Sequence, residues 1–113
     1  MLTKGNKLLL SILLPVVFSA NASAGETEIG QLNKAFIQGS DDITTIDIKV
    51  GDTLRFKNYD PFNHNIYSLS EPATFNLGSY PKGQSKVVKF DKPGKVDVEC
   101  AIHPQMHLTV NVK

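Results

Sequence analysis

The chain has 113 residues and a formal net charge of +1, because twelve Lys and Arg residues are balanced by eleven Asp and Glu residues. This length fits one small domain, and the near balance of charge excludes a protein that binds nucleic acid mainly through a basic surface. Hydrophobic residues make up 41% and charged residues 20% of the sequence, which is typical of folded globular domains and not of disordered chains. The single cysteine excludes an internal disulfide.

Residues 1–24 have the features of a secretory signal peptide. Two lysines precede an uncharged apolar stretch over residues 8–18, and small residues occupy both positions of an A-x-A motif that ends at Ala24. A transmembrane helix needs about 20 apolar residues, so this shorter stretch does not favour a membrane anchor. We therefore predict cleavage after Ala24 and a periplasmic domain of residues 25–113 without stable membrane insertion.

From Thr44 onward, apolar and polar residues alternate, which is the period of half-buried strands. The alternating segments 46–50 and 54–56 flank a Gly-Asp turn signal and predict a β-hairpin with one buried face. Residues 71–84 contain two Pro and two Gly and predict a long irregular connection. Further strands are predicted at 88–90, 96–100 and 108–112 and, from weaker signals, within 29–38 and 66–69.

The strand pattern defines a fold class. No window shows a helical period of 3.6 residues over three turns. About seven to eight short antiparallel strands joined by turns predict an all-β fold, a β-sandwich with Greek-key connections. Sandwiches of this kind serve adhesion, catalysis and electron transfer, so the function has to be inferred from the residues of a site.

The residues that carry chemistry are concentrated toward the C-terminus. His64, His103 and His107 all lie at predicted strand ends or in loops, and the last two follow the only cysteine, Cys100, within seven residues. Together with Met106, they offer a thiolate, imidazoles and a thioether. Imidazole suits Cu(II) and sulfur suits Cu(I), so this set of side chains is typical of a copper site.

Each of these residues also has an ordinary structural explanation. Cys100 falls in register with Val96 and Val98, as a buried and inert cysteine would. Met106 fits a core position, and isolated histidines are usually surface residues. A metal site is favoured because it explains together the unpaired thiol of an exported protein, the clustered histidines and the methionine.

Three stretches of the sequence resemble the cupredoxins, the small blue-copper electron carriers: residues 50–60, the pair His64-Asn65, and the run from Pro93-Gly94 through Cys100 to Met106. The Cys-x2-His-x2-Met spacing of the last run is most similar to that of amicyanins. The resemblance implies a cupredoxin-like fold and one type 1 copper that cycles between Cu(I) and Cu(II). The implied ligands are His64, Cys100 and His103, with Met106 as the weak axial ligand.

The axial ligand stays open between Met106 and His107. Side chains alternate along a strand, so Met106 shares a face with Leu108, whereas His107 shares a face with Thr109. This favours Met106, and His107 is the alternative. The resemblance further implies that the side chain of Asn65 ties the two ligand loops together by hydrogen bonds.

A copper ion with four protein ligands has no open position for a substrate, so we expect an electron-transfer protein and not an enzyme. The resemblance implies His103 as the electron port of a monomeric protein. Its expected partners are redox proteins, such as a dehydrogenase or a cytochrome-like donor or acceptor, and not nucleic acid. Two alternatives stay open: a copper carrier or buffer protein, and a metal-free immunoglobulin-like interaction module.

Overall fold

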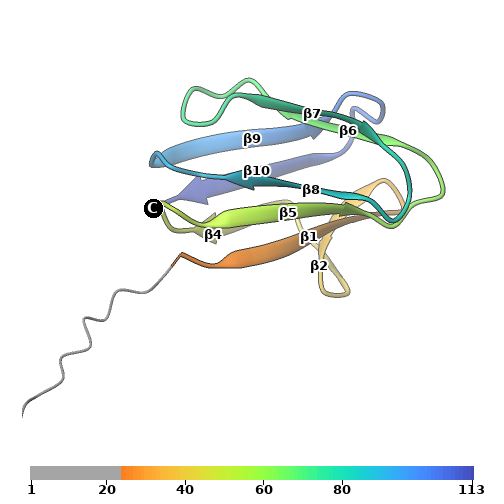
Figure 1. Ribbon diagram of the computed structural model, residues 1–113, viewed down its shortest axis with the longest axis horizontal. Helices are drawn as coiled ribbons and strands as arrows, with labels where there is room; N and C mark the ends of the chain where they lie inside the picture. Colours follow the sequence, from red (N-terminus) through yellow and green to blue (C-terminus); the bar gives the residue numbers. More distant parts are fainter. Residues whose placement is uncertain (1–23) are drawn as a thin grey trace, which may run out of the picture.

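The computed structural model describes residues 24–113, which form two five-stranded β-sheets packed as a sandwich (Figure 1). In spatial order, the first sheet contains β3 (Asp41–Asp42), β2 (Ala35–Gln38), β1 (Glu26–Leu32), β5 (Thr53–Asn58) and β8 (Ser85–Lys89). The second contains β4 (Thr45–Ile48), β10 (His107–Val112), β9 (Gly94–Cys100), β6 (His64–Ser68) and β7 (Phe75–Tyr80). The predicted signal peptide, apart from Ala24, lies outside the described residues.

The prediction of an all-β sandwich is confirmed, with ten described strands in place of seven to eight. The sheets are mixed and not purely antiparallel, because β1 runs parallel to β5 and β10 runs parallel to β4. Residues 24–113 contain no helix, and so none in that range is long and apolar enough to cross a membrane.

Alternating apolar side chains from both sheets fill the space between them. In β9, Val96, Val98 and Cys100 are at most 1% exposed, and in β10, Leu108 and Val110 are fully buried. The sequence alternation predicted this burial. Burying a side chain of this size stabilises the fold by about 1.5–3 kcal/mol. β9 and β10 therefore hold both ends of the loop between them in stable positions.

The predicted hairpin between segments 46–50 and 54–56 is wrong. β4 pairs with β10 in the second sheet, whereas β5 pairs with β1 and β8 in the first. The chain crosses between the sheets at a tight turn, in which the Asp52 N–H donates to the Lys49 carbonyl at 2.9 Å and Gly51 adopts a φ of 97°. Alternation does not reveal such a crossing, because both strands direct apolar side chains into the same core.

The strands expected from a weaker signal within 29–38 are found, and the first of them begins earlier. They are β1, which starts at Glu26, and β2, joined by a turn in which Asn33 and Lys34 have φ values of 55° and 59°. Positive φ at both central positions is characteristic of the two-residue type I′ hairpin turn. Residues 71–84, expected to be irregular, contain β7, an edge strand with an irregular pairing to β6.

One end of the sandwich brings together the loops that carry the predicted site. β9 ends at Cys100, β6 begins at His64, and Ile66 of β6 pairs with Cys100. The β5–β6 and β9–β10 loops therefore meet at the end of the sandwich drawn on the right in Figure 1. The β1–β2 turn lies at the same end, because its N–H groups bond to Asp60 in the β5–β6 loop.

Candidate metal centre

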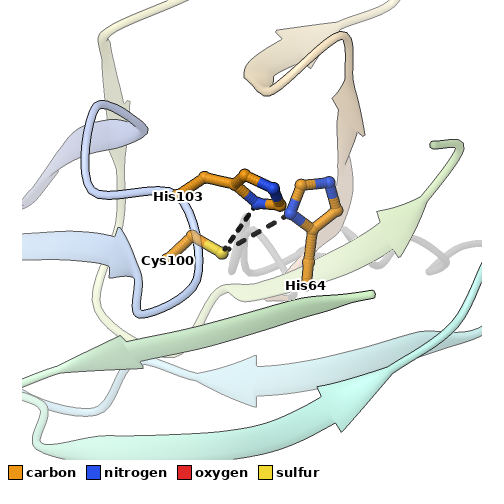
Figure 2. Close-up of side chains that lie close together, drawn as sticks. All are labelled: His64, Cys100 and His103. Carbon is orange, nitrogen blue, oxygen red and sulfur yellow. Dashed lines mark hydrogen bonds between the residues drawn. The ribbon is translucent and has the colours of Figure 1, made fainter. Parts of the chain in front are cut away.

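Three predicted ligands converge at this end of the sandwich. Figure 2 shows the imidazoles of His64 and His103 directed toward the sulfur of Cys100. The distance from Cys100 Sγ is 3.5 Å to His64 Nδ1 and 3.8 Å to His103 Nδ1, and the three donor atoms all lie within 4.8 Å of one another. This is the one cluster of at least three potential His, Cys, Asp or Glu ligands within residues 24–113.

The spacing of these atoms fits a single metal ion. Ligand bonds of about 2.3 Å to sulfur and about 2.0–2.1 Å to imidazole nitrogen place S and N about 3.6–3.8 Å apart at tetrahedral to trigonal angles. The observed separations of 3.5 Å and 3.8 Å match this geometry. One thiolate and two imidazoles are also the donor types of a trigonal copper site. The chain therefore holds the three side chains at metal-binding distances.

Burial differs between the three side chains. His64 is 0% and Cys100 is 1% exposed, whereas His103 is only partly buried. Burial lowers the pKa of His103, and the charge of Lys34 lowers it further. A lowered pKa keeps the ring neutral, which is the form that binds a metal. The Phe62 ring packs against both imidazoles, with centroids 5.0 Å from His103 and 5.5 Å from His64.

A short turn sets the position of His103. The Met106 N–H donates to the His103 carbonyl at 2.9 Å, which closes a four-residue turn. Pro104 is the second residue of this turn, a position that favours proline because its φ is fixed near the required value. Since Cys100 ends β9 and β10 begins at His107, the loop that carries His103 is held at both ends by paired strands.

The two ligand loops are tied together by main-chain groups. The Asn65 N–H donates to Cys100 Sγ at 3.4 Å, and the Ala101 N–H donates to the Asn65 carbonyl at 2.8 Å. The expected tie through the side chain of Asn65 is not found. Asn65 Oδ1 is buried and has no hydrogen-bond partner among the described residues. The β-pairing of Asn65 beside Cys100 already brings its backbone to the sulfur, so the amide is not needed for the tie.

Met106 and His107 point in opposite directions, as the strand alternation predicted. Met106 is 1% exposed and belongs to the core cluster that also contains Cys100. The His107 side chain is 47% exposed, and its Nε2 lies 3.3 Å from Asp97 Oδ1 on the outer face of β9. Of the two, only Met106 lies on the side of the strand that faces the core.

Asp60 is a site residue that the sequence reasoning missed. It is 1% exposed, and its Oδ2 lies 2.8 Å from His64 Nε2. Burial alone would raise the pKa of Asp60, but hydrogen bonds from the Lys34 N–H, from His64 and from the Asn33 N–H outweigh it, so the pKa lies below its ordinary value. The only sign of Asp60 in the sequence was that a carboxylate lies four residues before His64, the first histidine.

Neither the family models nor the curated proteins contain a match to the sequence. Among solved structures, the chain is similar to the Cu(I) form of a methionine-to-alanine mutant of amicyanin, with a TM-score of 0.68 and 21% identity over 78% of this chain and 82% of that one. A reduced tryptophan-to-tyrosine mutant of amicyanin gives a TM-score of 0.67 and 21% identity over 84% and 87%. A copper-containing nitrite reductase from Thermus scotoductus SA-01 gives a TM-score of 0.69 and 24% identity, and the match covers 88% of this chain and 25% of that one.

The sandwich and these similarities establish the class: the chain has the cupredoxin fold, as the sequence resemblance implied. Within this class, it matches the amicyanin structures over most of their length and only a quarter of the nitrite reductase chain. The cluster of His64, Cys100 and His103 offers one thiolate and two imidazoles, which are donor types that suit copper.

Proposed function

We propose that this protein is a periplasmic single-copper electron carrier with the four ligands that the resemblance to cupredoxins implies. His64, Cys100 and His103 would form the trigonal set, and Met106 would be the weak axial ligand. The observation that carries the proposal is the convergence of the two imidazole nitrogens on the cysteine sulfur at metal-binding distances, within a cupredoxin fold.

Rigid support of the ligands favours electron transfer. Bound copper would supply one-electron chemistry by cycling between Cu(I) and Cu(II). His64 and Cys100 are fixed by paired strands and by burial, so the ligand positions change little when the charge of the site changes. Four protein ligands also leave no position for a substrate, which supports a carrier in preference to an enzyme.

The partly exposed side of the centre supports contact with a redox partner. His103 is the least buried of the three clustered residues, and its neighbour Ile102 is an apolar side chain 47% exposed to solvent. An apolar surface of this kind suits a brief encounter, because weak electron-transfer complexes use small interfaces. We propose a dehydrogenase or a cytochrome-like protein as the partner class, with His103 as the electron port.

The decisive experiment is a visible absorption and electron-spin spectrum of residues 25–113 loaded with Cu(II). A Cu(II)–thiolate bond gives an intense visible band, so we expect a coloured protein that loses its colour in Cys100→Ala. A colourless loaded protein would refute the blue copper site and favour a metal-free interaction module.

A second experiment separates an electron carrier from a copper carrier. In an electron carrier the same copper ion stays bound through repeated oxidation and reduction. We therefore expect the reduced protein to retain its copper in the presence of a Cu(I) chelator and to recover its full colour on reoxidation. Rapid transfer of Cu(I) to the chelator would instead support a copper carrier or buffer.

The proposed location has its own test. Expression of the full chain in a bacterium, followed by release of the periplasmic fraction and mass spectrometry, should give a mature protein that begins at Gly25. Recovery of the uncleaved chain from the membrane fraction would contradict both cleavage and periplasmic release.

A further inference from the structure

Asp60 is a buried carboxylate directly beside His64, and the proposed ligand set assigns no role to it. Its side chain is 2% exposed, and its Oδ2 lies 2.8 Å from His64 Nε2, while His64 Nδ1 lies 3.5 Å from Cys100 Sγ. The imidazole is therefore held at both nitrogens, with one directed at a carboxylate and the other at the sulfur.

The β1–β2 turn holds this carboxylate in place. The Asn33 N–H donates to Oδ1 of Asp60 at 2.6 Å, and the Lys34 N–H donates to Oδ2 at 3.0 Å. Both turn residues have positive φ, and their two successive N–H groups converge on one anion. Together with the ring of His64, these groups surround the carboxylate with donors, which suits an ionised carboxylate because it only accepts hydrogen bonds.

This arrangement fixes the tautomer of His64. Because the carboxylate accepts, the ring hydrogen lies on Nε2, and Nδ1 keeps its lone pair toward Cys100. A carboxylate behind a metal-binding imidazole orients the ring and raises its basicity. A more basic imidazole favours Cu(II) over Cu(I), since the more highly charged ion gains more from the stronger donor.

We propose that Asp60 is a positioning residue of the copper centre: anchored to the β1–β2 turn, it sets the tautomer and basicity of His64 and thereby lowers the reduction potential. The effect on the potential rests on the proposed function, whereas the hydrogen bond between Asp60 and His64 belongs to the chain without metal. The β1–β2 turn, which carries none of the proposed ligands, thus becomes a third supporting segment of the centre.

The test compares wild-type protein, Asp60→Asn and a matched control, Asp97→Asn. The control removes a carboxylate that also lies against a histidine, His107, but on the exposed outer face of β9. We expect Asp60→Asn to lower Cu(II) affinity about 10- to 100-fold, as loss of a partner behind a metal ligand typically does. If Cu(I) affinity is unchanged, each tenfold loss raises the reduction potential by about 59 mV. Asp97→Asn should leave the potential unchanged.

A second measurement uses wild-type protein without metal. Nitrogen NMR of the His64 ring should show a hydrogen on Nε2 that exchanges slowly with solvent. This result keeps the inference testable if Asp60→Asn does not fold. A ring without a hydrogen on Nε2, or equal potentials for Asp60→Asn and wild-type protein, would overturn the inference. A wild-type protein that shows no copper colour would overturn the proposed function instead, and the NMR result would still decide the role of Asp60 toward His64.

Discussion

At the scale of single residues, the contrast between Met106 and His107 allows the axial ligand to be tested. Met106 is buried in the core cluster that contains Cys100, whereas His107 is half exposed beside Asp97. We expect Met106→Leu to keep the copper–thiolate colour and to raise the reduction potential, because an axial donor that stabilises Cu(II) is lost. Visible spectroscopy and protein voltammetry measure the two effects.

The neighbouring position provides the control for this substitution. His107→Ala removes an imidazole that lies on the opposite face of the strand, so the colour and the potential should stay close to those of the wild-type protein. A loss of colour in His107→Ala, or a change of potential as large as that of Met106→Leu, would assign the axial position to His107.

Asn58, which is buried, and Asn65, which is partly buried, differ in what their side chains contribute. Asn58 Nδ2 donates to the carbonyls of Phe62 and Tyr80 at 2.8 Å and 3.0 Å, and its Oδ1 accepts from the Asp60 N–H at 2.7 Å. Within residues 24–113, Asn65 Oδ1 has no hydrogen-bond partner, and the N–H of Asn65 that bonds to the cysteine sulfur belongs to the main chain.

Substitution with alanine should therefore separate the two positions. Leaving a buried partner without its hydrogen bond costs about 1–3 kcal/mol, so we expect Asn58→Ala to lower the free energy of unfolding by about 3 kcal/mol or more. Asn65→Ala should change it by less than about 1 kcal/mol and keep the copper colour. Urea unfolding of the metal-free proteins gives both values. A larger loss in Asn65→Ala would show that its side chain does tie the ligand loops.

At the scale of elements, the start of β9 depends on one glycine. Gly94 has a φ of 137°, and a Cβ added there would lie 2.8 Å from Cγ of Pro72. We expect Gly94→Ala to lower the free energy of unfolding by at least about 2 kcal/mol, because a strained φ alone costs about 1–3 kcal/mol. Gly39→Ala is the control: its φ is 65°, but apart from its own chain neighbours no residue in the described part of the chain comes within 4 Å of the added Cβ. Equal losses in urea unfolding would show that the contact with Pro72 adds nothing.

Strand positions were predictable where one face of the strand is buried. Leu108 and Val110 are fully buried and alternate with partly exposed residues, so the sequence located β10 closely. Strand partners were less predictable. β4 and β5 have the same alternation of buried and exposed residues as two strands of a hairpin, and yet they belong to different sheets. β7 escaped prediction because its burial does not alternate and a glycine with positive φ, Gly78, interrupts it.

At the scale of the whole molecule, the candidate centre combines local and distant contacts. The spacing of Cys100 and His103 is a local property of one turn, so the sequence revealed it directly. The role of Asp60 depends on Asn33 and Lys34, which lie 27 and 26 residues away in the β1–β2 turn. No periodicity or motif records such a contact, because it arises only when the β1–β2 turn and the β5–β6 loop meet at one end of the sandwich.

The other end of the molecule holds the expected start of the mature chain. The Gly25 N–H donates to Asp52 Oδ1 at 3.0 Å, and the Lys49 N–H donates to Asp52 Oδ2 at 2.9 Å. Asp52 therefore joins the beginning of the domain to the turn at which the chain crosses from β4 to β5. After the expected cleavage, the nitrogen of Gly25 becomes a charged amino group beside this carboxylate.

The stability of the mature domain should depend on pH through Asp52. Hydrogen bonds from the Lys49 and Gly25 N–H groups hold the pKa of Asp52 below its ordinary value of 3.8. A carboxylate with a lower pKa in the folded than in the unfolded state stabilises the fold above pH 3.8, and this contribution is lost as the pH falls through the folded value. We therefore expect Asp52→Asn to lower the urea midpoint at neutral pH, and its difference from the wild-type protein to shrink at about pH 2. A difference of the same size at both pH values would show that the charge of Asp52 does not contribute to stability.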